Sequence, residues 1–103
     1  MLKHCVFLNF KKGFTKADRI EVFERLAALE KEINGLMFVE YGENLDFENK
    51  SADYSDGFIA TFRDREAQHE YETHPDHIKA GARLVEMCVD GYDGIIVFDL
   101  EVD

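Results

Sequence analysis

The sequence predicts a single α+β domain, with one four-stranded antiparallel sheet that carries helices on one face. Strand-like and helix-like segments follow one another in the order β-α-β-β-α-β, and this order closes readily as a split βαβ, ferredoxin-like sheet. No repeat, linker or low-complexity stretch divides the 103 residues, 46% of which are hydrophobic. This length is that of one ordinary domain, so residues 1–103 are expected to share one core.

The first half of the chain predicts a strand, a helix and a second strand. Side chains alternate between two sets over residues 3–10, as they do on the two faces of a strand. Thr15 is a good helix N-cap, and Asp18 three residues later resembles a capping box. The helix that follows carries an apolar stripe and ends before Gly35, a natural stop. The second strand is expected over residues 36–42.

The second half predicts two strands and a broken helix. Pro75 cannot continue a helix but is well placed as the first residue of a new one. Asp64 can cap the helix before this break. The elements expected here are a polar connection over 43–55, a strand over 57–63, a short helix over 65–73, a second helix from 75 to about 88, and a last strand over 92–102.

The predicted strands are apolar on both faces, which indicates a homodimer. Adjacent apolar pairs occur in the first three strands, and a run of four occurs in the last: Val6 and Phe7, Phe38 and Val39, Phe58 and Ile59, and 95–98. Helices can cover only one face, and soluble monomers rarely expose a large apolar patch. A second copy of the chain, related by two-fold symmetry, is the simplest cover for the open sheet face.

Charge and composition exclude several classes of function. The formal net charge is −10, with 22 acidic and 12 basic residues, so binding of nucleic acid or of an anionic membrane surface is not expected. No stretch approaches the roughly 20 apolar residues of a membrane-spanning helix. The first twelve residues read as a strand rather than a signal peptide. Cys5 and Cys88 lie in apolar surroundings and are expected to be buried and reduced in a cytoplasmic protein, although a disulfide between them stays open.

The densest cluster of reactive side chains spans residues 71–77. His77 falls in the first turn of the helix that Pro75 begins, where the helix dipole disfavours an imidazolium and favours a neutral general base. Asp76 opposes that shift, so its direction stays open. Tyr71 lies across the helix break and could polarise a carbonyl oxygen through its phenol. His4, in the first strand, is the third candidate.

A packing interpretation competes with this one. His74 could simply cap the new helix, Tyr71 could be a core aromatic, and His4 could be a satisfied core or interface histidine. Spacing alone favours packing, because most histidine-containing turns are not active sites. His74 and His77 could also share a metal, but they would need a third ligand and their spacing is common. We therefore expect neither a metal nor a cofactor.

The same residues resemble the stress-responsive A/B barrel (Dabb) domains of the dimeric α+β barrel superfamily. The resemblance covers essentially the whole chain, and its most specific element is Tyr71-Glu72-Thr73-His74-Pro75-Asp76-His77. The other matching pieces are His4 to Phe7, Gly35, Gly42 to Asn44, Asp64 to Ala67, and Phe98 with Asp99. The resemblance implies a ferredoxin-like protomer and a homodimer whose two sheets face each other as a barrel.

The plant polyketide cyclases of this family imply a specific chemistry. In them a tyrosine and a histidine in this segment carry an intramolecular aldol condensation, aided by a histidine in the first strand; Tyr71, His77 and His4 match these positions. A further pocket histidine is not matched, because Asp56 stands in its place. That departure leaves the cyclase substrate and the reaction open.

Two functions follow for the sequence. In the first, a cofactor-independent cyclase or lyase removes a proton next to a carbonyl group through His77, while Tyr71 binds the developing enolate and His4 orients the substrate. Its pocket would lie between sheet and helices and would hold a small apolar or carbonyl-bearing molecule, with a lining of Phe7, Phe23, Ile59, Phe98 and His74. In the second, the chain is a non-catalytic dimeric module for ligand binding or stability. An enclosed cavity at the Tyr/His set favours the enzyme, and a packed interior favours the module.

Overall fold

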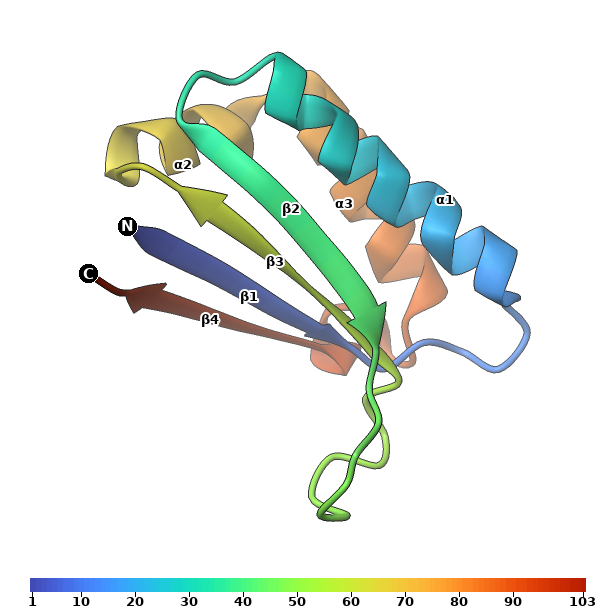
Figure 1. Cartoon of the computed structure of the whole chain (residues 1–103). Helices are drawn as coiled ribbons and strands as arrows, with labels where there is room; N and C mark the ends of the chain where they lie inside the picture. The colour runs from blue at the N-terminus through green and yellow to red at the C-terminus, as the bar shows by residue number, and fades with distance from the viewer.

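The computed structural model describes residues 1–103, in which helices cover one face of a single sheet (Figure 1). The predicted order of strands and main helices is confirmed. The elements are β1 (Leu2–Leu8), α1 (Lys16–Ala27), the 3-10 helix η1 (Ala28–Lys31), β2 (Leu36–Glu43), β3 (Asp56–Phe62), α2 (Arg65–Thr73), α3 (Pro75–Met87), the 3-10 helix η2 (Gly91–Gly94) and β4 (Ile95–Glu101).

The sheet has the strand order β2-β3-β1-β4, and every neighbouring pair is antiparallel. The predicted ferredoxin-like α+β fold is therefore confirmed. β1 lies at the centre, so a side chain on it can meet groups from both β3 and β4. None of the helices is long and apolar enough to cross a membrane.

Local signals fix the helix ends as predicted. Thr15 and Asp18 form the reciprocal capping box of α1. The Asp64 side chain accepts a hydrogen bond from the Ala67 amide at 2.9 Å and caps α2. His74 has extended backbone geometry with a ψ of 133°, because the residue before a proline is disfavoured in the helical region. It both ends α2 and begins α3.

Most predicted strand ends differ from the structure by one residue, and the end of β1 and the start of β4 differ by two or three. β1 stops at Leu8 rather than at residue 10, because the chain then pairs with a segment outside the sheet: the Asn9 carbonyl accepts from the Val89 amide, and Phe10 forms an isolated bridge with Cys88. β3 begins one residue early, at Asp56. β4 begins at Ile95 and not at residue 92, because Asp90 adopts a left-handed conformation with φ 57° and starts the tight turn η2.

The core lies between the sheet and the helices, while the other face of the sheet is uncovered. Val6, Leu8 and Phe62 are among the buried residues on the helix side. The open face carries a set of partly exposed apolar side chains, with exposures between 37% and 57%: Phe7, Phe38, Ile96, Phe98 and Leu100. Both cysteines are buried and unpaired, as predicted.

Candidate functional site

The structure brings Tyr71, His77 and His4 together at one end of the helix-covered face. Tyr71 lies in the last turn of α2, His77 in the first turn of α3, and His4 on β1. The break at Pro75 folds the His77 ring back onto Tyr71, so that their ring centroids lie 4.2 Å apart. The His4 and Tyr71 rings lie 6.0 Å apart, edge to face. The convergence of the three side chains agrees with the sequence hypothesis, while their chemical role stays a prediction.

Tyr71 is the most enclosed member of this set. Its side chain is 1% exposed, and its hydroxyl is buried with no hydrogen-bond partner in the chain. Burial raises the pKa of Tyr71 well above its usual range. The phenol therefore keeps its proton at physiological pH and can donate a hydrogen bond to an oxygen that reaches it. An unpaired buried hydroxyl is a costly group to retain.

The environment of His77 leaves one ring nitrogen ready to accept a proton. Nδ1 lies 3.2 Å from the Glu72 carbonyl oxygen, which can only accept a hydrogen bond, so Nδ1 carries the hydrogen and Nε2 keeps the lone pair. Desolvation is the main cause that holds the pKa of His77 below its usual 6.5; the nearby His4 acts in the same direction, and the bond to Glu72 opposes it. The sequence left the direction of the His77 pKa shift open, and burial sets it downward. A histidine with a pKa below 6.5 is neutral at pH 7.

A carboxylate orients His4. Nδ1 of His4 lies 2.6 Å from Asp99 Oδ1, and the two side chains are 14% and 59% exposed. Because a carboxylate at this distance accepts from Nδ1, the other nitrogen of His4 is the one left free in the neutral ring. Sequence reasoning missed Asp99 as a site residue. Asp99 lies directly opposite His4 in the β1–β4 register, and that register is known only once the strands are paired.

His74 does not belong to the Tyr/His set. Its Nδ1 accepts a hydrogen bond from the Asp76 amide at 3.1 Å and caps α3, as the packing interpretation expected. Its Nε2 therefore carries the hydrogen, and this atom faces Glu32 Oε1 at 4.0 Å. Ligand atoms of Glu32, His74 and Asp76 lie within 4.8 Å of one another, with His77 outside this group. Nδ1 of His74 is thus occupied by the helix cap, and the sharing of a metal by His74 and His77 has no geometric support.

The predicted lining of a pocket between sheet and helices was wrong for three residues. Phe7, Ile59 and Phe98 point to the open face, where the Phe7 and Phe98 rings lie 6.4 Å apart and Ile59 pairs with Cys5. His4 and Phe7 are three positions apart on one strand, so their side chains leave opposite faces of the sheet.

Phe23 lies on the helix side as predicted, but packed side chains surround it. Its ring stacks on that of Tyr41 with the centroids 5.0 Å apart, and it meets the rings of Phe10 and Phe58 at centroid distances of 6.0 Å each. Phe58 in turn lies 6.3 Å from His4. A continuous row of aromatic rings therefore fills the helix side of the sheet as far as the Tyr/His set. Seven hollows mark the surface, and none of the four main ones, of about 390 to 500 Å³, is lined by Tyr71, His77 or His4.

Comparisons with known proteins agree on one family and one fold. The sequence model described as the Stress responsive A/B Barrel Domain matches residues 2–102. The chain is 26% identical to the stress-response A/B barrel domain-containing protein HS1 of Arabidopsis thaliana, over 95% of this chain and 86% of that protein. It is 26% identical to olivetolic acid cyclase of Cannabis sativa, over 95% of this chain and 93% of the cyclase. A crystal structure from Jannaschia sp. CCS1, described as a dimeric ferredoxin-like protein of unknown function, is 44% identical and superposes with a TM-score of 0.91 over 98% of both chains.

Proposed function

The chain belongs to the stress-responsive A/B barrel domain family, and from that premise we propose that it is a homodimeric, cofactor-independent enzyme that removes a proton next to a carbonyl group. The reaction takes place at Tyr71, His77 and His4. One observation carries the proposal: the buried Tyr71 hydroxyl has no partner in the chain, although it lies beside two imidazoles. A group retained at such a cost is expected where it serves chemistry.

Each side chain has a distinct task in this reaction. His77 Nε2 takes the proton from the carbon, and the electron pair of the C–H bond forms the enolate. The Tyr71 hydroxyl donates a hydrogen bond to the carbonyl oxygen and stabilises the negative charge that develops there. His4, held by Asp99, orients the substrate. The enolate can then attack a second carbonyl carbon, which is the aldol step that the family resemblance implies.

A second candidate function rests on the packed interior, which by the cavity criterion of the sequence favours a non-catalytic module over an enzyme. The Phe62 and Tyr71 ring centroids lie 5.0 Å apart, and none of the four main hollows reaches the Tyr/His set. In this reading Tyr71 and His77 tie the helix break to the sheet, and the chain is a non-catalytic dimeric module. Replacing either residue by alanine, which removes the packed ring, would then lower the unfolding temperature and change no reaction.

Deuterium exchange separates the two functions without knowledge of the natural substrate. Acetone, cyclohexanone and acetophenone are incubated with the protein in D₂O, and deuterium at the carbon next to the carbonyl is measured by NMR. The enzyme should accelerate exchange, and Tyr71→Phe and His77→Gln should each reduce the enzyme-dependent rate by about 10²-fold or more. His69→Gln is the matched control, because His69 is exposed on α2 outside the set. Exchange at the buffer rate with every ketone would instead support the module.

The dimer is proposed to form through the open face of the sheet. Support comes from the partly exposed apolar side chains there and from similar structures that are described as dimeric. Phe98→Arg places a charge on this face and should yield a monomer by light scattering. Tyr92→Arg is the control, because Tyr92 is 79% exposed in η2, outside the sheet. A Phe98→Arg protein that stays dimeric would place the interface elsewhere.

A further inference from the structure

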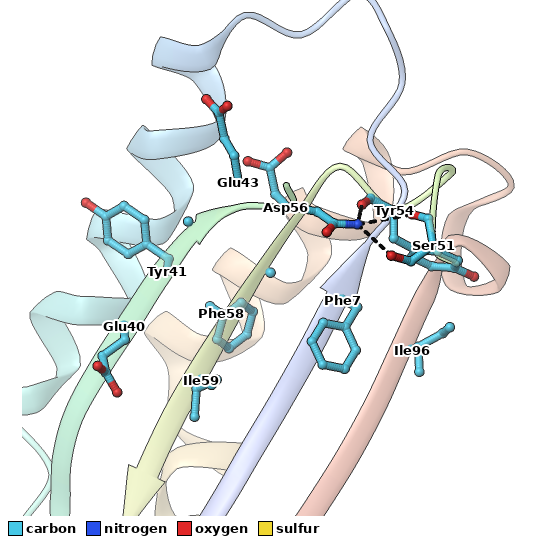
Figure 2. A pocket seen from close by; sticks show the side chains of 13 residues that line it. Phe7, Glu40, Tyr41, Glu43, Ser51, Tyr54, Asp56, Phe58, Ile59 and Ile96 are labelled. Carbon is cyan, nitrogen blue, oxygen red and sulfur yellow. Dashed lines mark hydrogen bonds between the residues drawn. The ribbon is translucent and has the colours of Figure 1, made fainter. Parts of the chain in front are cut away.

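We propose that the open face carries a second binding site, for an apolar small molecule that is neutral or cationic. The site is a hollow of about 500 Å³ at the end of the sheet where β2 and β3 leave for their connecting loop (Figure 2). Small-molecule sites commonly have volumes of about 300–1,000 Å³. The hollow lies on the opposite side of the sheet from Tyr71, so it is independent of the proposed proton transfer.

A pair of glycines creates the hollow. Gly42 on β2 and Gly57 on β3 are direct cross-strand partners, so two neighbouring positions of the open face carry no side chain. Neither glycine has a positive φ, and backbone geometry therefore does not require glycine at either position. A Cβ atom at Gly42 would meet nothing within 4 Å, whereas one at Gly57 would lie 3.0 Å from the Phe7 ring. What glycine supplies at position 42 is open space.

Apolar side chains from three strands form the walls of this space. Phe7 from β1, Ile59 from β3 and Ile96 from β4 surround the glycine pair (Figure 2). Within one protomer Phe7 and Ile96 are 39% and 37% exposed, so a molecule that enters at this end of the open face covers apolar surface that a single chain leaves uncovered. That burial is the main source of affinity expected for such a ligand.

The charged groups of the lining are all acidic, which defines the class of ligand. They are Glu40, Glu43 and Asp56, and no lysine or arginine lines the hollow. Glu43 pairs with Lys16 at 3.3 Å and Asp56 with Arg19 at 3.2 Å, but Glu40 has no partner. A negative potential at the rim disfavours an anion.

Of these acidic side chains, only Glu40 faces the hollow. Asp56 pairs across the strands with the buried Leu8, so its side chain turns to the helix side of the sheet, where it meets Arg19 of α1. Glu40 pairs with Ile59 and lies on the same face as Phe7. The ligand is therefore an apolar ring or chain that carries no negative charge.

Two fluorescent probes with the same rings test this specificity. N-phenyl-1-naphthylamine is neutral and has one N–H donor, and 8-anilino-1-naphthalenesulfonate is the same skeleton with a negative charge. Titration of the wild-type dimer should give saturable binding of the neutral probe, with one probe per protomer. Its dissociation constant should be at least about ten-fold lower than that of the sulfonate.

Gly42→Leu fills the hollow without a clash inside the protomer and should weaken binding of the neutral probe by about ten-fold or more. Gly13→Leu is the matched control, since a Cβ at Gly13 also meets nothing within 4 Å and Gly13 lies in a turn away from the hollow. Tyr71→Phe should bind the probe as the wild type does, whether or not the proposed catalysis holds.

Several results would overturn the proposal. One is the absence of saturable binding of the neutral probe below about 100 μM, and another is undiminished binding by Gly42→Leu. Equal affinity for the sulfonate would refute the charge argument. If the wild type binds no probe and Gly42→Leu weakens only the dimer, a side chain of the partner fills the hollow instead.

Discussion

Replacing Tyr71 with phenylalanine should raise the stability of the fold and lower the rate of ketone exchange. The substitution removes one oxygen atom and leaves the ring, which contacts Phe62 and His77 at centroid distances of 5.0 and 4.2 Å. Because the hydroxyl is buried without a partner, its removal takes away a desolvation penalty and breaks no hydrogen bond within the chain. A tyrosine whose hydroxyl is hydrogen-bonded in the folded protein would show the opposite sign of stability change.

The magnitude follows from the cost of an unpaired hydroxyl. Mutational data place that cost at about 1–3 kcal/mol, and the small gap left by the oxygen offsets part of the gain. We expect a net rise of about 1 kcal/mol in the free energy of unfolding, or roughly 4–8 °C in unfolding temperature for a domain of this size. Tyr71→Ala removes the ring as well and should cost about 3–5 kcal/mol.

Urea denaturation, followed by circular dichroism at one fixed protein concentration, measures the stability change. The concentration must be fixed because the apparent stability of a dimer depends on it. The exchange rate is measured on the same preparations. A Tyr71→Phe protein less stable than the wild type by 1 kcal/mol or more would mean that the hydroxyl is hydrogen-bonded in the folded protein, and the argument for a reactive phenol would fail.

Three further outcomes follow from the geometry. Asp99→Ala should slow ketone exchange by about ten-fold or more, whereas Asp99→Asn should keep part of the rate, because an amide oxygen can still accept from His4 Nδ1. The pKa of His77 is lowered in the folded protein, so as the pH falls the unfolded chain takes up a proton at its usual pKa of 6.5 before the folded chain does. In urea titrations the wild type should therefore lose stability as the pH falls below about 6.5, and His77→Gln should lose less. Gly35→Ala should lower the free energy of unfolding by about 2 kcal/mol, since Gly35 has φ +96° and its added Cβ would lie 2.7 Å from Ala67 Cβ; an unchanged urea midpoint would contradict this.

Most of the fold could be predicted because its signals are local. A capping box needs only Thr15 and Asp18, and a helix break needs only Pro75, so both are visible in a short window of sequence. The ends of β1 and β4 were misplaced because the interactions that end them are tertiary. The Asn9 carbonyl meets the Val89 amide only after the helices have packed on the sheet and brought residues 88–89 beside it.

The candidate site was predictable in part for the same reason. Tyr71 and His77 are six residues apart across a recognisable break, while the contact of His4 with Tyr71 depends on the packing of the helices onto β1. Asp99 could not be assigned without the register of β4. The wrong assignment of the pocket lining could have been avoided from the sequence. Side chains alternate along a strand, so Phe7 lies on the face opposite His4.

The second site was not visible in the sequence either. Gly42 and Gly57 lie in different strands with a loop between them, and neither glycine alone indicates a hollow. They become neighbours once the β2–β3 register is set. The same register places Asp56 opposite Glu43 at the edge of the hollow. Sequence indicated only that a histidine of related proteins is absent from position 56.

The state of the His77 ring is the most direct test of the central claim, that a neutral base lies beside an unpaired phenol. Two-dimensional NMR of ring-¹⁵N-labelled histidines, assigned with His77→Gln and followed over pH, reports both the tautomer and the pKa. We predict a neutral ring at pH 7, with the hydrogen on Nδ1 and a pKa below 6.5. A protonated ring at pH 7, or a neutral ring with its hydrogen on Nε2, would contradict the proposed role of His77.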